Sequence, residues 1–92
     1  MKTPDIVVYT SAFCPYCNWA KKLLSAKKVE FDEIRIDMDP SQAALMVEKA
    51  GRTSVPQIFI GDLHVGGYDD LAAMDRAGRL DPILGLSDQE PV

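Results

Sequence analysis

The segment that most constrains the fold is an apolar run followed closely by a helix pattern. Ile6 to Tyr9 is a continuous run of β-branched and aromatic side chains, which predicts a buried strand. Pro15 suits the first position of a helix, where its missing N–H is no loss. The apolar side chains on one face of this helix are Cys17, Ala20, Leu23 and Leu24. A strand that passes into a helix begins a β-α-β unit, so the chain is predicted to be an α/β protein.

Strand and helix patterns continue to alternate along the chain. Asp39 is a predicted N-cap, Pro40 fits the first turn, and Gly51 ends the helix. Gly61-Asp62 is the two-residue signal of a β-hairpin. The predicted elements are strands at 5–9, 33–37, 56–60 and 63–65, and helices at 15–27, 40–50 and 69–77, the last capped by Asp69 or Asp70. The predicted buried stripe of the second helix is Ala43, Met46, Val47 and Ala50.

The order β-α-β-α-β-β-α predicts a four-stranded mixed sheet with helices on both faces. Two helical crossovers imply a parallel core, and the hairpin adds an antiparallel edge. The 92 residues suffice for one domain, which we expect to span residues 1–85, with a flexible tail at 86–92 and a short turn at Asp81-Pro82.

Composition and charge exclude several classes of protein. The net charge of −4 disfavours nucleic-acid binding, which requires a basic face. No apolar run approaches the ~20 residues of a membrane span, and residues 1–5 lead into the first strand without a signal-peptide region, so we expect a cytoplasmic protein. Two cysteines and the lone His64 supply too few ligands for a four-ligand zinc site.

Cys14-Pro15-Tyr16-Cys17 lies where the first strand passes into the first helix. Cys14 precedes the helix, so its sulfur can face free backbone N–H groups and the positive end of the helix dipole. Both stabilise a thiolate and lower its pKa below the free value of about 8.5. Cys17 lies one turn further on, so it should attack a mixed disulfide on Cys14 rather than a substrate. Half of a metal site is the alternative, but there is no second Cys pair, and redox chemistry is favoured.

Three motifs in this order resemble the dithiol glutaredoxins. They are Cys14-Pro15-Tyr16-Cys17, the Thr53-Ser54-Val55-Pro56 segment with its following strand, and Gly66-Gly67-Tyr68-Asp69-Asp70. The resemblance implies a thioredoxin-like fold and a glutathione-dependent thiol–disulfide oxidoreductase that reduces glutathione mixed disulfides and protein disulfides. It implies glutathione as co-substrate, no tightly bound cofactor and no metal. Expected partners are glutathione and disulfide-containing or glutathionylated proteins, ribonucleotide reductase among them, and we expect a monomer.

The resemblance also assigns residues to the binding of glutathione. Pro56 matches the family's cis-proline, and the main chain of Val55 would pair with the cysteinyl part of glutathione. The helix that Asp69 and Asp70 open would hold the γ-glutamyl carboxylate, and the Asp70 side chain the γ-glutamyl ammonium. The other expected members of this site are Tyr16, Arg52 (for the glycine carboxylate), Ser54 and Gly67.

The chain departs from the family at Ser11, where many members carry a lysine nearby, and the loop from Thr10 to Phe13 has no cation. Two alternatives to the glutathione-dependent function stay open. The first is an electron donor of related fold fed by thioredoxin reductase, which the Gly-Gly-Tyr-Asp-Asp segment disfavours. The second is an iron–sulfur carrier that holds a cluster with Cys14 of two chains and two glutathiones, which the stiff Pro15 disfavours.

Overall fold

The computed structural model describes residues 5–85 and contains eight elements. They are β1 (Ile6–Thr10), α1 (Pro15–Ala26), β2 (Asp32–Arg35), α2 (Pro40–Ala50), β3 (Gln57–Ile60), β4 (Leu63–Gly66), α3 (Tyr68–Arg76) and α4 (Leu80–Leu84). The predicted order is confirmed, and the expected turn at Asp81-Pro82 is the short helix α4. The predicted tail at 86–92 lies outside the described residues. No helix within residues 5–85 is long and apolar enough to cross a membrane.

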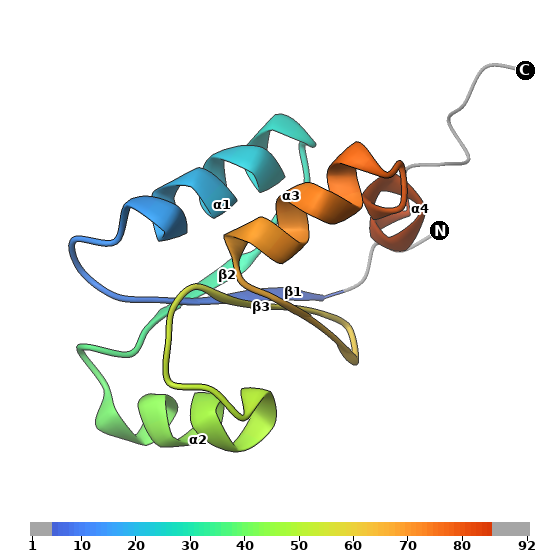
Figure 1. Cartoon of the computed structure of the whole chain (residues 1–92). Coiled ribbons are helices and arrows are strands. Elements are labelled where there is room, and N and C mark those ends of the chain that lie inside the picture. Colours follow the sequence, from blue (N-terminus) through green and yellow to red (C-terminus); the bar gives the residue numbers. More distant parts are fainter. Residues whose placement is uncertain (1–4, 86–92) are drawn as a thin grey trace, which may run out of the picture.

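The four strands form one mixed sheet in the order β2-β1-β3-β4. Only β1 and β2 are parallel; β3 is antiparallel to β1, and β4 is antiparallel to β3. The predicted parallel core is therefore wrong. Gln57 lies opposite Tyr9, so β3 begins at the end of the sheet where β1 ends. Figure 1 shows why: after α2 the chain turns back and enters β3 from that same end.

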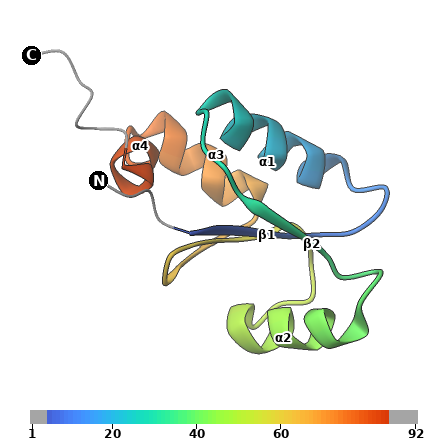
Figure 2. The same cartoon turned by 180° about the vertical axis from the view of Figure 1, so that it is seen from behind.

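Helices cover both faces of the sheet unequally. α1, α3 and α4 lie on one face and α2 alone lies on the other, as Figure 2 also shows from behind. The main core lies between the sheet and the three-helix side and consists of Ile6, Val8, Ala20, Leu24, Ile58, Ile60, Leu71, Leu80 and Leu84. Of the stripe predicted for α2, only Met46 is fully buried, and Val47 is 39% exposed. A single helix that packs on a sheet buries only a narrow strip of the helix surface, and the rest of the helix faces solvent.

The helix starts follow from local chemistry, with one correction. Cys14 and Asp39 cap α1 and α2, each with a proline in the first turn, as predicted. α3 begins earlier than predicted, with Gly67 rather than an aspartate as its N-cap. Asp70 instead reaches back from the first turn, and its Oδ2 accepts the Gly67 N–H at 3.1 Å. Gly66 makes this possible: its φ is +113°, and a Cβ there would overlap the Asp70 carboxylate.

Candidate active site

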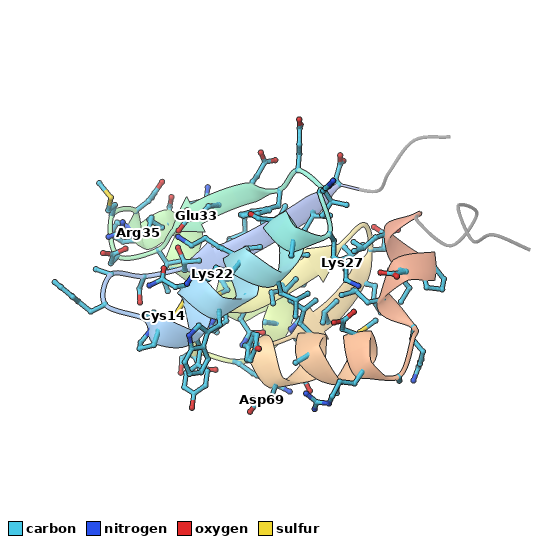
Figure 3. All side chains as sticks on the ribbon, turned by 90° about the horizontal axis from the view of Figure 1, so that it is seen from above. Cys14, Lys22, Lys27, Glu33, Arg35 and Asp69 are labelled. Carbon is cyan, nitrogen blue, oxygen red and sulfur yellow. A yellow bond between two sulfur atoms is a disulfide. The ribbon has the colours of Figure 1, made fainter. Side chains whose placement is uncertain are left out.

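Cys14 and Cys17 are joined by a disulfide at the start of α1, with their Cα atoms 5.2 Å apart. Figure 3 shows Cys14 at this end of the helix. Cys17 is 2% exposed, whereas Cys14 is partly exposed. The Cys17 N–H donates to Cys14 Sγ at 3.1 Å, so Cys14 is the N-cap of α1 through its sulfur. After reduction the same N–H points at the sulfur that would carry negative charge.

A second segment, distant from the cysteines in sequence, lies next to the disulfide. The Val55–Pro56 peptide bond is cis, and the Val55 carbonyl oxygen lies 3.9 Å from Cys14 Sγ. This is a contact and not a hydrogen bond, because a disulfide sulfur carries no proton. The backbone just before β3 therefore lies directly beside the outer cysteine.

A cleft of about 200 Å³ opens next to this segment. Its lining includes all eight residues that sequence reasoning assigned to a ligand, together with two others. The lining residues are Tyr16, Arg52, Ser54, Val55, Pro56, Gln57, Gly67, Tyr68, Asp69 and Asp70. They come from α1, the segment before β3 and the start of α3. Figure 3 shows Cys14 and Asp69 at the starts of their two helices, at the same end of the molecule.

Opposite charges meet in the cleft. Arg52 Nη1 lies 3.8 Å from Asp70 Oδ2, and both side chains are about half exposed, at 55% and 52%. Asp70 also accepts the Gly67 N–H, so its carboxylate is held between a cation and the first turn of α3. A cleft with a cation, a carboxylate and a helix N-terminus can hold a small ligand that carries both carboxylate and ammonium groups.

Three aromatic side chains from α1 and α3 pack against one another, and two of them, Tyr16 and Tyr68, also line the cleft. The ring centroids of Tyr16 and Trp19 are 5.1 Å apart, those of Trp19 and Tyr68 are 5.7 Å apart, and those of Tyr16 and Tyr68 are 6.4 Å apart. Tyr16 is 52% exposed and Trp19 48%. Sequence reasoning did not assign Tyr68 to the site, although the residue lies inside the Gly-Gly-Tyr-Asp-Asp motif.

The loop before Cys14 is held by an ion pair that sequence reasoning missed. Asp37 Oδ2 accepts the Ala12 N–H at 3.3 Å, and Arg35 donates to both Asp37 oxygens at 2.8 and 2.7 Å. The Arg35 guanidinium, by hydrogen bonding to the carboxylate, lowers the pKa of Asp37. Phe13 follows in this loop with a φ of 57° and a fully exposed side chain. The hydrogen bond from Ala12 links this loop to Asp37, just after β2 and 25 positions away in sequence.

A family model, similar sequences and similar solved structures all indicate the same family for this chain. Residues 6–65 match the family model of glutaredoxin. A glutaredoxin of Pseudomonas aeruginosa is 56% identical over 81 residues, which are 88% of this chain and 96% of that protein. The solution structure of glutaredoxin from Brucella melitensis has 43% identity and a TM-score of 0.81, over 100% of this chain and 98% of that one. The crystal structure of a buckwheat glutaredoxin–glutathione complex has 30% identity and a TM-score of 0.82, over 89% and 77%.

The chain belongs to the glutaredoxin family. Its fold is the thioredoxin-like fold that the sequence predicts, a four-stranded mixed sheet with helices on both faces. Because the chain is a glutaredoxin and carries the Cys14–Cys17 pair, it is a thiol–disulfide oxidoreductase with a redox-active disulfide.

Proposed function

We propose that this protein uses glutathione as electron donor and reduces glutathione mixed disulfides and protein disulfides through Cys14 and Cys17. The observation that carries the proposal is the cleft beside Cys14, which combines Arg52, Asp70 and the start of α3 with the backbone of Val55. Its support from outside the chain is the related buckwheat protein, whose structure is a complex with glutathione.

Each part of glutathione has a complementary group in the cleft. The Val55 backbone would pair with the cysteinyl unit and bring its sulfur to Cys14, because the Val55 carbonyl already lies 3.9 Å from Cys14 Sγ. Arg52 would bind the glycine carboxylate. The first N–H groups of α3, at Asp69 and Asp70, would bind the γ-glutamyl carboxylate, and the Asp70 side chain its ammonium.

The monothiol reaction begins with the Cys14 thiolate. It attacks the glutathione sulfur of a mixed disulfide, the S–S bond breaks, and the substrate leaves as a thiolate that takes a proton from water. A second glutathione thiolate then attacks the sulfur of the glutathione bound to Cys14, which gives glutathione disulfide and restores the Cys14 thiolate. In total, one mixed disulfide and one glutathione thiol give one substrate thiol and one glutathione disulfide, because the other glutathione comes from the substrate itself.

The dithiol reaction uses both cysteines. Cys14 attacks one sulfur of a protein disulfide and forms a mixed disulfide. Cys17 then attacks the Cys14 sulfur, releases the reduced protein and closes the Cys14–Cys17 disulfide seen here. Two glutathiones reopen it and leave as glutathione disulfide. The burial of Cys17 suits this internal step, because a large substrate cannot reach its sulfur.

A comparison of electron donors tests the proposal. The protein is supplied either with glutathione, glutathione reductase and NADPH, or with thioredoxin reductase and NADPH, and turnover of a glutathionylated peptide is followed by NADPH absorbance. We expect rapid turnover with the first system only. Turnover that requires thioredoxin reductase would contradict the proposal. Visible colour in anaerobically purified protein, together with negligible turnover in both systems, would instead favour an iron–sulfur carrier.

A further inference from the structure

Gln57 is a fully buried polar side chain that reaches the cleft from β3. It is 0% exposed and lines the cleft beside Ser54. Its Nε2 donates to the Ser54 carbonyl oxygen at 3.1 Å and lies 3.4 Å from the Ser54 hydroxyl. Gln57 thus holds the backbone immediately before the Val55–Pro56 bond. A buried amide of this kind requires hydrogen-bond partners at both ends, since a buried polar atom without a partner destabilises the folded state.

The other end of Gln57 is bonded by His64 of β4. The His64 Nε2 lies 2.7 Å from Gln57 Oε1. Only one orientation of the Gln57 amide satisfies the whole chain of bonds. A carbonyl can only accept, so the amide nitrogen of Gln57 must face Ser54, and the amide oxygen must face His64. The Nε2 atom of His64 therefore carries a hydrogen and donates it.

Two neighbours fix the position of the His64 ring. The ring stacks on Phe59, with centroids 4.7 Å apart and an angle of 21° between the planes. His64 and Phe59 also line a second cavity of about 310 Å³ on the sheet face that α2 covers. His64 is therefore not among the residues that line the cleft with Ser54, and its hydrogen bond to Gln57 joins it to that cleft.

We propose that His64 is a positioning residue for the glutathione cleft, which it orders through Gln57 and Ser54. This rests on the proposed function. By donating to Gln57, His64 orients the amide that anchors the Ser54 carbonyl, and the anchored segment presents the Val55 backbone beside Cys14. Loss of the donor would let this segment move and would weaken the alignment of a glutathione sulfur, without changing the thiolate itself.

Two substitutions at position 64 isolate the hydrogen bond. His64→Phe keeps an aromatic ring that can stack on Phe59 but cannot donate to Gln57. His64→Gln has an amide N–H at a similar reach and can restore the donor. Leu63→Gln, at a 43% exposed neighbouring position on the same strand, is the control for a change on β4 that leaves the hydrogen-bond chain intact.

The measurement is the rate of attack by Cys14 on two substrates, in a Cys17→Ser background. One is a peptide glutathionylated at its cysteine, and the other is the same peptide with a mercaptoethanol mixed disulfide. We expect His64→Phe to slow attack on the glutathionylated peptide by about three- to tenfold, the effect of losing one hydrogen bond, and to change the mercaptoethanol reaction by less than about twofold. His64→Gln should recover most of the loss, and Leu63→Gln should match the parent protein.

The outcomes separate this inference from the proposed function. If the parent protein does not prefer the glutathionylated peptide, the proposed function fails. If it does prefer that peptide but His64→Phe slows both substrates equally, or neither, the positioning role is wrong. Long-range ¹H–¹⁵N spectra of the parent protein give a test that does not depend on the folding of a variant. A neutral His64 ring protonated at Nδ1 would overturn the inference.

Discussion

Cys14 and Cys17 share one disulfide, yet their surroundings differ. Cys14 is partly exposed and accepts the Cys17 N–H, whereas Cys17 is 2% exposed. We expect Cys14→Ser to abolish activity on all disulfides. Cys17→Ser should retain reduction of a glutathionylated peptide and lose most reduction of protein disulfides, because only the dithiol route needs the inner thiol. Both activities are measured with glutathione and its reductase. Equal losses for the two variants on the glutathionylated peptide would contradict these roles.

Asp70 has a structural and an electrostatic contact that two substitutions can separate. Its carboxylate accepts the Gly67 N–H and lies near Arg52. Asp70→Asn keeps an acceptor for the N–H but loses the charge, whereas Asp70→Ala loses both. We expect kcat/KM for a glutathione mixed disulfide to fall in both variants. The fall should correspond to a loss of about 1–3 kcal/mol in transition-state stabilisation, the range for a charged hydrogen-bond partner.

The stability of the two Asp70 variants should differ. Asp70→Ala also removes the side-chain acceptor of the Gly67 N–H at the start of α3, which costs about 0.5–2 kcal/mol in the free energy of unfolding, while Asp70→Asn should keep most of this contribution. Urea unfolding measures this term. A mercaptoethanol mixed disulfide is the control substrate and should react normally with Asp70→Asn. If Asp70→Asn has normal kcat/KM for the glutathione substrate, Asp70 only accepts the Gly67 N–H at the start of α3 and does not bind the ammonium group.

A substitution at Ser11 can test whether a side-chain cation or the helix terminus stabilises the Cys14 thiolate. The loop from Thr10 to Phe13 has no cation, while the Cys17 N–H lies 3.1 Å from Cys14 Sγ. Hydrogen bonds to a charged acceptor contribute about 1.5–3 kcal/mol each, and 1.36 kcal/mol corresponds to one pKa unit. Ser11→Lys should therefore lower the Cys14 pKa by roughly one unit or less, because an exposed cation is screened.

The titration is followed by thiolate absorbance in a Cys17→Ser background, with and without Ser11→Lys. A parent pKa near that of free cysteine, followed by a fall of several units in Ser11→Lys, would mean that the helix terminus contributes little. Ser11→Met is a control of similar size to lysine without its charge, and it should leave the titration unchanged.

At the level of elements, one lysine joins three helices on the main-core side of the sheet. Lys27, the C-cap of α1, lies 2.6 Å from Asp75 Oδ1 in α3 and 2.8 Å from Asp81 Oδ1 in α4, and Figure 3 shows it next to these helices. The hydrogen bond to Asp75, and to a smaller extent the one to Asp81, raises the pKa of Lys27. The lysine side chain is 22% exposed, so solvent screens the contacts only in part.

The raised pKa gives Lys27 a defined dependence of stability on pH. A group whose pKa is higher in the folded state stabilises that state fully below its unfolded pKa of about 10.4 and loses the contribution as pH rises through the folded value. We expect Lys27→Met to lower the free energy of unfolding by about 1 kcal/mol at pH 8, and the difference from the parent to shrink above about pH 10.5.

Urea unfolding at a series of pH values measures the Lys27 effect. Lys28→Met, at the next residue, is the matched control, because no ion pair of Lys28 is found among residues 5–85. A difference between Lys27→Met and the parent that stays constant to pH 11 would show that lost packing, and not the charge, explains the destabilisation.

At the level of the whole molecule, local sequence patterns predict the order of the elements but not their final arrangement in the sheet. Pro15, Asp39 and the Gly61-Asp62 turn act on neighbouring residues, so they predict the element order well. The direction of β3 depends instead on where residues 51–56 deliver the chain, and no local pattern encodes that. The parallel core was predicted wrongly for this reason.

The same distinction applies to the site. The resemblance carried by the cysteine pair and two short motifs implies eight binding residues, and all eight line the cleft; their binding of glutathione stays a prediction. Two hydrogen bonds near the site are not predicted from the sequence, because each joins residues from different elements: Ala12 donates to Asp37 across 25 positions, and His64 bonds Gln57 across the β3–β4 hairpin. A histidine and a glutamine on neighbouring strands have no sequence signature that predicts a hydrogen bond between them.

The unequal cover of the two sheet faces leads to a prediction about stability within the molecule. Three helices and the main core protect one face, whereas α2 contributes only Met46 as a fully buried side chain to the other. Regions with few buried apolar contacts open at lower free energy than the global transition. We expect native-state hydrogen exchange to give α2 amides an opening free energy about 1 kcal/mol or more below that of β1, β3 and α1.

Two core truncations decide whether α2 is a separate unit. Leu24→Ala removes a fully buried side chain of α1, and Met46→Ala removes the one of α2. Each should cost about 2–5 kcal/mol if its site contributes to the global core. We expect Leu24→Ala to lower the exchange free energies of β1, β3 and α1 together. Met46→Ala should lower those of α2 by at least about 1 kcal/mol more than those of β1, because α2 can open while the main core stays folded. Equal decreases in α2 and β1 for Met46→Ala would show that α2 unfolds only with the rest of the molecule.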